Sequence, residues 1–260
     1  MARLSIALPA LAGLALSVSS MALAQDASGG SWAGAYGGLH IGYGASSDDD
    51  VDTTGQAAVN VTNVTGGARP AKVSLDSDGF VGGVALGYNW QSGTLVYGLE
   101  ADLDYTDLEE TRTVNTATLP TAAVAGRLNN TFTQSLDYLG TLRARVGYAF
   151  NGGATLGYVT GGLAYGNVDN SVDMRGVTNL PQFAGSDDNT EYGFALGGGF
   201  EHAVQGPWRL TASYLYYDLG SETTNVAVIP TAVPLGGGTG YNSEFDTSGH
   251  LMRVGFGYKF

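Results

Sequence analysis

Beyond its first two dozen residues, the chain alternates apolar and polar residues with a period of two through eight separate segments. This alternation is typical of a strand that has one face in an apolar environment and the other in a polar one. Each segment has about 10 to 15 residues, and about ten residues of a tilted strand cross an outer membrane. The segments are residues 32–44, 79–90, 95–105, 136–150, 155–166, 191–200, 208–219 and 249–260.

The connections between these segments alternate in length. The short ones are residues 91–93, 151–153 and 204–207, and the long ones are residues 45–78, 106–135, 167–190 and 220–248. A soluble meander has no reason to lengthen every second loop, whereas a transmembrane barrel has short periplasmic turns and long outer loops. The sequence therefore predicts an all-β fold: an eight-stranded antiparallel up-and-down transmembrane β-barrel with four long outer loops and three short periplasmic turns.

The charged residues of the predicted strands lie on one face, opposite an uninterrupted apolar face. An Arg or Lys on the lipid side costs about 2 to 4 kcal/mol at the membrane midplane, so we expect these charges in the lumen. There the acids would meet the bases and avoid the penalty of unpaired burial. Glycines on the same face, such as Gly83 and Gly87, would make room for them. The predicted lumen charge network consists of Glu100, Asp102, Asp104, Asp137, Arg143, Arg145, Glu201, Arg209 and Arg253.

Aromatic residues gather at the segment ends that face the short turns. Rings at the boundary between lipid tails and headgroups form the girdles of outer-membrane barrels. The alternative, that the three tryptophans are core residues of a soluble protein, does not explain why all three fall at one end of the strands. The predicted periplasmic aromatic girdle consists of Trp32, Tyr88, Trp90, Tyr148, Phe150 and Trp208.

The first residues have the features of a secretory signal. Arg3 precedes the apolar residues 4–18, and Ala22-Leu23-Ala24 has the small-x-small pattern of a cleavage site. A retained membrane anchor is disfavoured because the apolar stretch is short and contains Pro9. The predicted domains are a signal peptide at 1–24, a short N-terminal segment at 25–31 and an outer-membrane β-barrel at 32–260.

Composition excludes several other classes of protein. Glycine contributes 41 of 260 residues, and charged residues are 13% of the chain, against about 25% in soluble domains. The net charge of −13 disfavours nucleic acid as a partner. The absence of cysteine excludes disulfides and thiolate metal sites.

The sequence contains no motif for catalysis, so we expect no enzyme activity and no cofactor. Outer-membrane lipid A deacylases resemble one another in a His-x-Ser pair. None of the histidines of this chain has serine two positions later; they are His40, His202 and His250. No Gly-x-Ser-x-Gly or His-Glu-x-x-His motif occurs. The acidic run from Asp48 to Asp52 offers oxygen ligands for Ca²⁺ but lacks EF-hand spacing, and a solvated loop is the favoured interpretation.

Several sequence segments together resemble those of the small eight-stranded outer-membrane barrels of Gram-negative bacteria, the porin-family or OmpA-like surface proteins. They include residues 32–38, 79–90, 97–102, 141–148, 160–166, 214–220 and 253–260. The resemblance implies an outer-membrane location and contact with lipid and lipopolysaccharide. It also implies that the assembly machinery reads the terminal strand, with Phe256, Tyr258 and Phe260 as the signal.

These observations leave three functions to compare. The main hypothesis is a structural, surface-exposed protein that contributes to envelope integrity and displays a surface antigen; the ligand of its loops stays unknown. The alternative is a pore for small solutes, and the packing of the lumen distinguishes the two. A secreted lipocalin-like barrel is a third class, but it would need a more highly charged exterior.

Overall fold

The computed structural model describes residues 31–47, 50–229 and 239–260. The predicted signal peptide and nearly all of segment 25–31 lie outside these ranges, as do Asp48 and Asp49. The described residues form ten strands and one helix. They are β1 (Gly34–Ser46), β2 (Asp50–Gly55), α1 (Ala58–Thr65), β3 (Lys72–Ser74), β4 (Asp78–Ser92), β5 (Leu95–Ala117), β6 (Arg127–Phe150), β7 (Thr155–Arg175), β8 (Pro181–Ala203), β9 (Trp208–Val228) and β10 (Gly240–Lys259).

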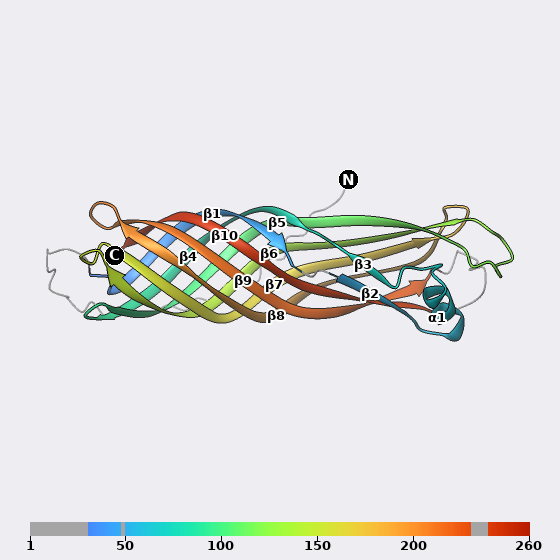
Figure 1. The fold of residues 1–260 in the computed structure, drawn as a ribbon, viewed down its shortest axis with the longest axis horizontal. Coiled ribbons are helices and arrows are strands. Elements are labelled where there is room, and N and C mark those ends of the chain that lie inside the picture. The colour runs from blue at the N-terminus through green and yellow to red at the C-terminus, as the bar shows by residue number, and fades with distance from the viewer. Residues whose placement is uncertain (1–30, 48–49, 230–238) are drawn as a thin grey trace.

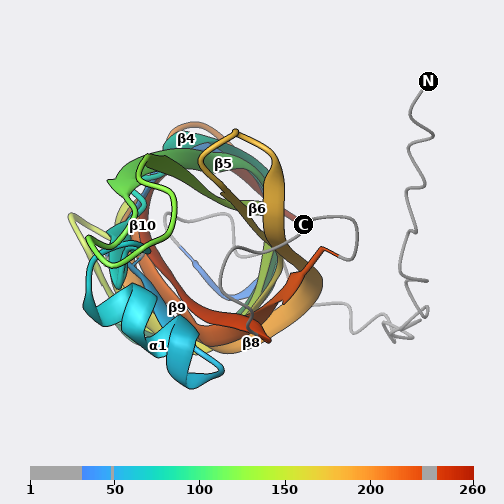
Figure 2. The same ribbon diagram turned by 90° about the vertical axis from the view of Figure 1, so that its right-hand side faces the viewer.

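Eight of these strands close into an antiparallel ring. Their order is β1-β4-β5-β6-β7-β8-β9-β10, and β10 pairs back onto β1 from Tyr36↔Lys259 to Ser46↔Gly249. Figure 1 shows the resulting long cylinder from the side, and Figure 2 shows the ring from one end. The predicted eight-stranded up-and-down barrel is confirmed.

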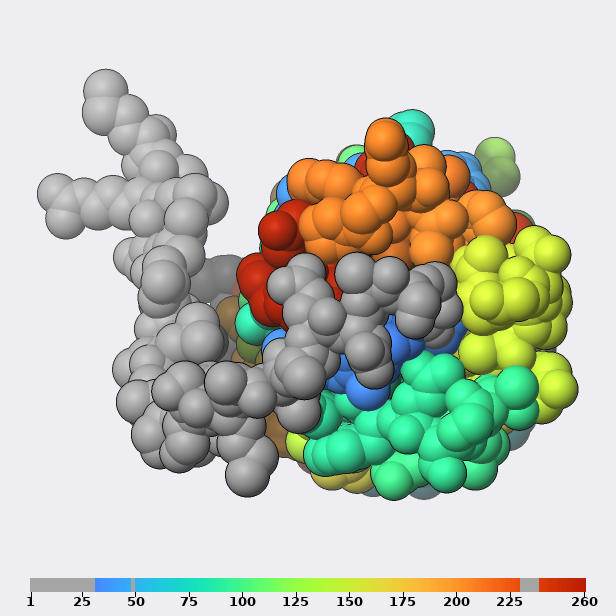
Figure 3. All heavy atoms as spheres, turned by 90° about the vertical axis from the view of Figure 1, so that its left-hand side faces the viewer, coloured from blue at the N-terminus to red at the C-terminus, as the bar shows by residue number. Residues whose placement is uncertain are grey.

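Three tight turns join strands at one end of the barrel, as the sequence predicted. Gly93 and Gly206 lie in these turns with φ of 60° and 61°, values that glycine adopts without steric cost. Asn151, in the third turn, has φ 56°, which asparagine tolerates better than most residues. Figure 3 shows this end, where the turns after β4, β6 and β8 are blue-green, yellow-green and orange.

The four connections at the opposite end are long, but most of their residues are strand rather than loop. Strands β5 to β10 continue far past the predicted segments, so that the ring becomes a tall extension (Figure 1). The first connection leaves the ring and forms β2, α1 and β3. Strand β2 then pairs with Tyr241 to Phe245 of β10, in the place that β1 occupies lower in the barrel.

The extension is apolar inside and polar outside. On its outer face, threonines of β5 and β6 pair across the strands. The hydroxyl oxygens of Thr111 and Thr133 lie 2.9 Å apart, as do those of Thr113 and Thr131. Burial of apolar side chains inside it stabilises the strands without lipid around them. The buried cluster contains Val51, Val73, Leu75, Phe132, Val172, Met174, Phe183, Val226, Tyr241 and Phe245.

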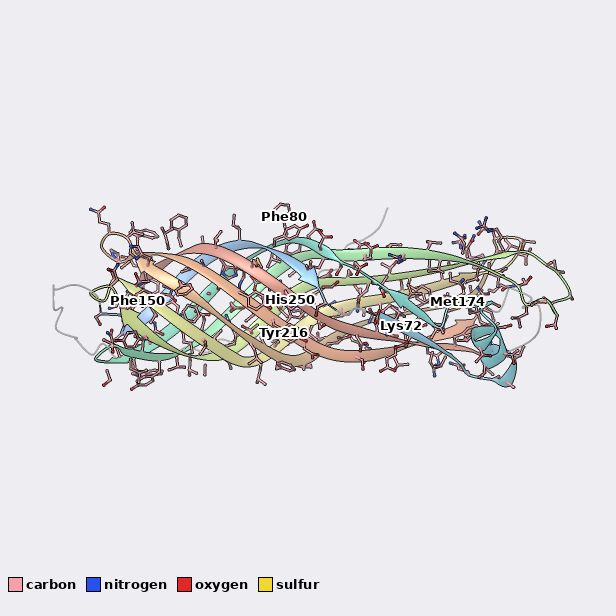
Figure 4. All side chains as sticks on the ribbon, viewed as in Figure 1. Lys72, Phe80, Phe150, Met174, Tyr216 and His250 are labelled. Atoms are coloured by element: carbon pink, nitrogen blue, oxygen red, sulfur yellow. The ribbon has the colours of Figure 1, made fainter. Side chains whose placement is uncertain are left out.

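The lower part of the barrel is apolar outside instead. Its outward side chains, such as Leu39, Leu99 and Val254, are more than half exposed. Aromatic residues border this apolar band on the side of the extension, one from each of seven strands. They are Tyr43, Phe80, Tyr105, Tyr138, Tyr165, Tyr192 and Tyr216, of which Figure 4 labels Phe80 and Tyr216.

Candidate functional site

The interior of the apolar band holds a cluster of buried charges supplied by neighbouring strands. Glu100, Asp102 and Asp104 alternate along β5 and therefore share its inner face. The register places Glu100 directly opposite Arg143 of β6, and Arg145 follows two residues later on the same face. Period-2 alternation on adjacent strands thus brings acids and bases together.

Arg143 joins two of these acids. Its Nη2 lies 2.8 Å from Oε1 of Glu100 and also contacts Oδ2 of Asp102. Its Nε donates to Oγ1 of Thr141 at 2.8 Å. These contacts give the guanidinium charge-assisted partners, which offset the cost of removing it from water.

Arg253 of β10 continues the cluster across the barrel. Its Nη1 lies 2.7 Å from Oδ2 of Asp104 and 3.5 Å from Oδ1 of Asp102. The other oxygen of Asp104 contacts Nε2 of His40, which projects inward from β1. The predicted lumen histidine is therefore an ion-pair or hydrogen-bond partner of a buried carboxylate.

Arg145 carries the cluster to the far wall. Its Nη1 lies 3.0 Å from Oε2 of Glu100, and its Nη2 contacts Oε1 of Glu201 on β8. Nη1 also donates to the hydroxyl of Tyr36 at 2.8 Å, and that hydroxyl donates to Glu100. A Cβ at Gly87 would lie 2.3 Å from the Tyr36 ring, so glycine is required for this arrangement.

Together these contacts form one continuous chain of side chains across the lumen, which we call the lumen network. It contains four carboxylates, three guanidinium groups and one imidazole, and its acids and arginines are all less than 10% exposed. A cavity of about 50 Å³ lies beside it, lined by Glu201 and Arg253 among others. The network runs through His40, Asp104, Arg253, Asp102, Arg143, Glu100, Arg145 and Glu201.

Asp137 was predicted to belong to the lumen, and the structure corrects this. A β-bulge between Leu136 and Tyr138 adds one residue to β6. The alternation therefore shifts, so that Leu136 is buried inside and Asp137 is exposed outside. Bulges change which face a side chain occupies, and a strict alternation cannot anticipate them.

Arg209 is buried inside the barrel, but its partners differ from the predicted acids. Within the described ranges no carboxylate lies within 4.0 Å of its guanidinium. Instead, Cζ lies 4.1 Å from the centroid of the Trp32 ring, and Nη2 is 3.5 Å from the Ser31 carbonyl oxygen. Arg209 is thus held by a cation–π contact.

Trp32 is the second correction, because it lies inside the barrel and not in the girdle. It is 2% exposed and packs with Val96, Ala149 and Leu156 near the short turns. Its Nε1 donates to the Gly153 carbonyl oxygen at 2.9 Å. Trp32 precedes the first paired residue of β1, so strand alternation did not determine its direction.

The other five predicted girdle residues are exposed on the outer face near the short turns. Trp90 contacts Tyr88 and Tyr97 with centroid distances of 4.9 and 5.9 Å, and Trp208 contacts Tyr258 at 5.1 Å. Figure 4 labels Phe150 at this end of the barrel. The exposed residues are Tyr88, Trp90, Tyr148, Phe150 and Trp208, together with the terminal Phe256, Tyr258 and Phe260.

The remaining chemical candidates have ordinary partners. His202 Nδ1 lies 3.0 Å from Thr155 Oγ1, and His250 Nδ1 lies 2.7 Å from the Tyr214 hydroxyl. Asp50, from the acidic run, lies 2.7 Å from Lys72 Nζ. Among the described residues no group of three or more His, Cys, Asp or Glu is placed to hold a metal ion. No helix in the described ranges is long and apolar enough to span a membrane.

The family model for the outer membrane protein beta-barrel domain matches residues 10–260. The chain belongs to this outer-membrane β-barrel family. A 31 kDa outer-membrane immunogenic protein of Brucella melitensis biotype 1 is 31% identical over 238 residues, which cover 88% of this chain and 84% of that protein. A 22 kDa outer membrane protein of Rhizobium leguminosarum bv. viciae is 32% identical over 144 residues, 55% of this chain and 54% of that protein.

The comparison with solved structures agrees on the fold. The crystal structure of the outer membrane protein OprG from Pseudomonas aeruginosa has a TM-score of 0.52 and 16% identity, covering 89% of this chain and 98% of that one. The family model and the outer-membrane relatives locate the protein in the outer membrane, where its apolar band spans the bilayer. In such barrels the short turns are periplasmic. The extension then lies outside the cell.

Sequence reasoning missed one buried acid of this outer-membrane barrel. Glu191 of β8 is the first residue beyond the band-edge residue Tyr192, and its side chain is buried. Burial raises the pKa of Glu191 to about 7; the hydroxyl of Thr247 opposes the rise and the carboxylate of Glu222 adds to it. Glu191 is the first residue of the predicted segment 191–200, and the β8 alternation with the outward Tyr192 would have placed this acid on the inner face.

Proposed function

We propose that this protein is a closed, structural outer-membrane barrel that presents a folded extension at the cell surface. The lumen network supports the proposal most directly, because it connects β1, β5, β6, β8 and β10 through buried ion pairs. The proposal assigns no catalysis and no cofactor to the chain.

The network accounts for closure because it fills the space that water would need. An eight-stranded barrel is just wide enough for side chains to fill it. Here guanidinium groups and carboxylates occupy the lumen, and the adjoining cavity of about 50 Å³ has space for few waters. Trp32 and Arg209 fill the interior nearer the periplasmic end.

The extension supplies the surface role. Its outer face is polar and its interior is a packed apolar cluster, so it holds a defined shape above the membrane. The names of the Brucella relatives call them immunogenic. That description fits a protein whose outer part is accessible at the cell surface, which is the role we propose for this chain.

Single-channel recording in planar bilayers tests closure against the pore alternative. We expect no resolved openings for the wild-type protein. The double variant Arg143→Ala/Arg145→Ala, which empties the centre of the lumen network, should conduct. Arg112→Ala, which removes an exposed arginine of β5, serves as the matched control. Steady conductance by the wild type, with ion selectivity altered by Arg143→Ala, would support the pore instead.

Lipopolysaccharide is the lipid partner that we propose, through divalent cations. Asp137, Asp169 and Asp188 lie just beyond the outer aromatic residues, where headgroup phosphates are expected. Burial raises the pKa of Asp169, and the carboxylates of Asp188 and Asp137 add to the rise. Carboxylates and phosphates are both ligands for Ca²⁺ and Mg²⁺.

In lipopolysaccharide bilayers, EDTA should lower the melting temperature of the wild type more than that of the triple Asp→Asn variant; equal shifts would refute this partner.

A further inference from the structure

The outer end of the extension contains a pocket of about 390 Å³ next to α1. Figure 2 shows α1 at this end of the barrel. This volume is in the range of sites that bind small molecules. The pocket lies beyond the membrane and is separate from the lumen network. Much of its wall is apolar, with Leu119, Ala122, Val124, Leu128, Val177 and Phe183 among the lining residues.

One charged side chain lines this pocket. Arg69 follows α1 and is only 3% exposed. Its Nη1 donates to Oδ1 of Asn130 at 2.6 Å and to the Arg175 carbonyl oxygen at 3.2 Å, and its Nη2 donates to Oε1 of Gln182 at 3.0 Å. These acceptors are all neutral.

In the part of the chain that the structure describes, the charge of Arg69 therefore has no counter-charge. Among the residues that the structure describes, no carboxylate oxygen lies within 4.0 Å of its guanidinium. Each arginine of the lumen network, by contrast, contacts one or more carboxylates. Arginine stays protonated in proteins, and a buried charge without an opposite charge carries a desolvation cost that an anion would reduce.

The surroundings fix the guanidinium in place. Nδ2 of Asn130 donates to the Val114 carbonyl oxygen and to Thr116 Oγ1 at 3.1 Å each, which directs its Oδ1 toward Arg69. The backbone nitrogen of Arg69 donates to the Asn63 carbonyl oxygen at 3.0 Å. A cation held in this way requires little ordering when a ligand binds.

We propose that this pocket binds a small amphiphilic monoanion, with its carboxylate or sulfonate head at Arg69 and its apolar tail against Leu119, Leu128 and Phe183. The buried uncompensated charge selects an anion, and the apolar wall selects a hydrocarbon or aromatic tail. The inference goes beyond the proposed function and holds whether or not the lumen conducts.

Equilibrium dialysis of radiolabelled octanoate against the full-length mature protein in lipid nanodiscs tests the inference, with empty nanodiscs subtracted. We expect saturable binding of one octanoate per chain. Octanesulfonate should compete, octylamine should not, and octan-1-ol should compete at least about tenfold more weakly, because it lacks the charge. Equal competition by octanol would show that Arg69 does not bind the head, and an absence of saturable octanoate binding would overturn the proposal.

Three variants locate the site. Arg69→Gln removes the charge and should weaken binding at least about tenfold. Ala122→Trp fills the pocket without altering Arg69 and should also abolish binding, so the test survives if the first variant fails to fold. Arg127→Gln, an exposed arginine near the same end, should bind within about twofold of the wild type. Unchanged affinity in both Arg69→Gln and Ala122→Trp would place octanoate elsewhere and refute the site.

Discussion

The guanidinium of Arg209 lies 4.1 Å from the ring centroid of Trp32, inside the barrel near its periplasmic turns. Arg209 comes from the inner face of β9, whereas Trp32 precedes β1. The contact therefore ties the start of the barrel to a strand that is not its neighbour in the ring. Lys259 Nζ donates to the Ser31 carbonyl oxygen at 2.8 Å, so the end of β10 is joined to the same segment.

Replacement of Trp32 by alanine should lower the free energy of unfolding by about 3 to 5 kcal/mol, the range for a large buried aromatic side chain. The loss has two causes: a cavity among Val96, Ala149 and Leu156, and an Arg209 without its aromatic partner. Urea unfolding of refolded protein measures the change. Trp90→Ala, on the lipid side, is the control and should cost less. If both variants lose the same free energy of unfolding, burial of Trp32 inside the barrel does not add to stability.

The ion pair between Arg145 and Glu201 gives a second prediction. Arg145→Met leaves Glu201 buried without its cation and should destabilise the barrel by about 3 to 5 kcal/mol. The double variant Arg145→Met/Glu201→Gln should cost less than the sum of the single changes, by about 1 to 3 kcal/mol. Arg112→Met, at an arginine of β5 whose side chain is exposed and has no ion pair among the described residues, should change stability by less than about 0.5 kcal/mol. Strictly additive costs would mean that the two side chains do not interact.

Glu191 makes stability depend on pH. Its pKa rises from 4.5 to about 7 in the folded protein. Between these two pH values the folded state therefore keeps a proton that the unfolded state has already released. This contribution to stability is complete below about pH 4.5 and is lost as pH rises to about 7. The expected loss is about 2 to 4 kcal/mol.

Unfolding of Glu191→Gln across pH 4 to 8 tests this assignment. The variant has no carboxyl to titrate, so its stability should fall less than that of the wild type over this interval. Glu109→Gln, an exposed glutamate of β5, should keep the wild-type slope. An unchanged slope in Glu191→Gln would attribute the pH dependence to other acids.

The sequence predicted the ring and the lumen charges because both depend on period-2 alternation, which the bilayer imposes residue by residue. Glu100, Arg143 and Arg145 followed from this rule alone. Asp137 did not, because a bulge in β6 shifts the alternation at that residue. Trp32 did not, because it precedes the paired part of β1 and its direction depends on tertiary packing.

The height of the barrel also escaped prediction. Beyond Tyr105 the outward face of β5 becomes polar, with Glu109 and Thr111, so the pattern of a lipid-facing strand ends there although the strand continues to Ala117. The pocket at Arg69 escaped prediction for the same reason, because it lies in the extension, where the pattern of lipid-facing strands has ended. Its partners Asn130 and Gln182 come from distant parts of the chain, and only the closed ring brings them together.

The end of the chain gives the last prediction. Phe256 and Tyr258 lie on the lipid side of β10, and Phe260 directly follows this strand. Phe260 is 75% exposed and contacts Tyr258 at a centroid distance of 5.4 Å. A residue with so few protein neighbours contributes little to packing, so its deletion should leave refolding into detergent micelles nearly unchanged. If the assembly machinery reads this residue, the same deletion should sharply reduce the amount of folded barrel in cells and increase periplasmic degradation. Heat-dependent migration on detergent gels measures folded protein in both settings. Deletion of Phe260 that impairs refolding in vitro as strongly as assembly in cells would make the residue a stability element and refute the signal.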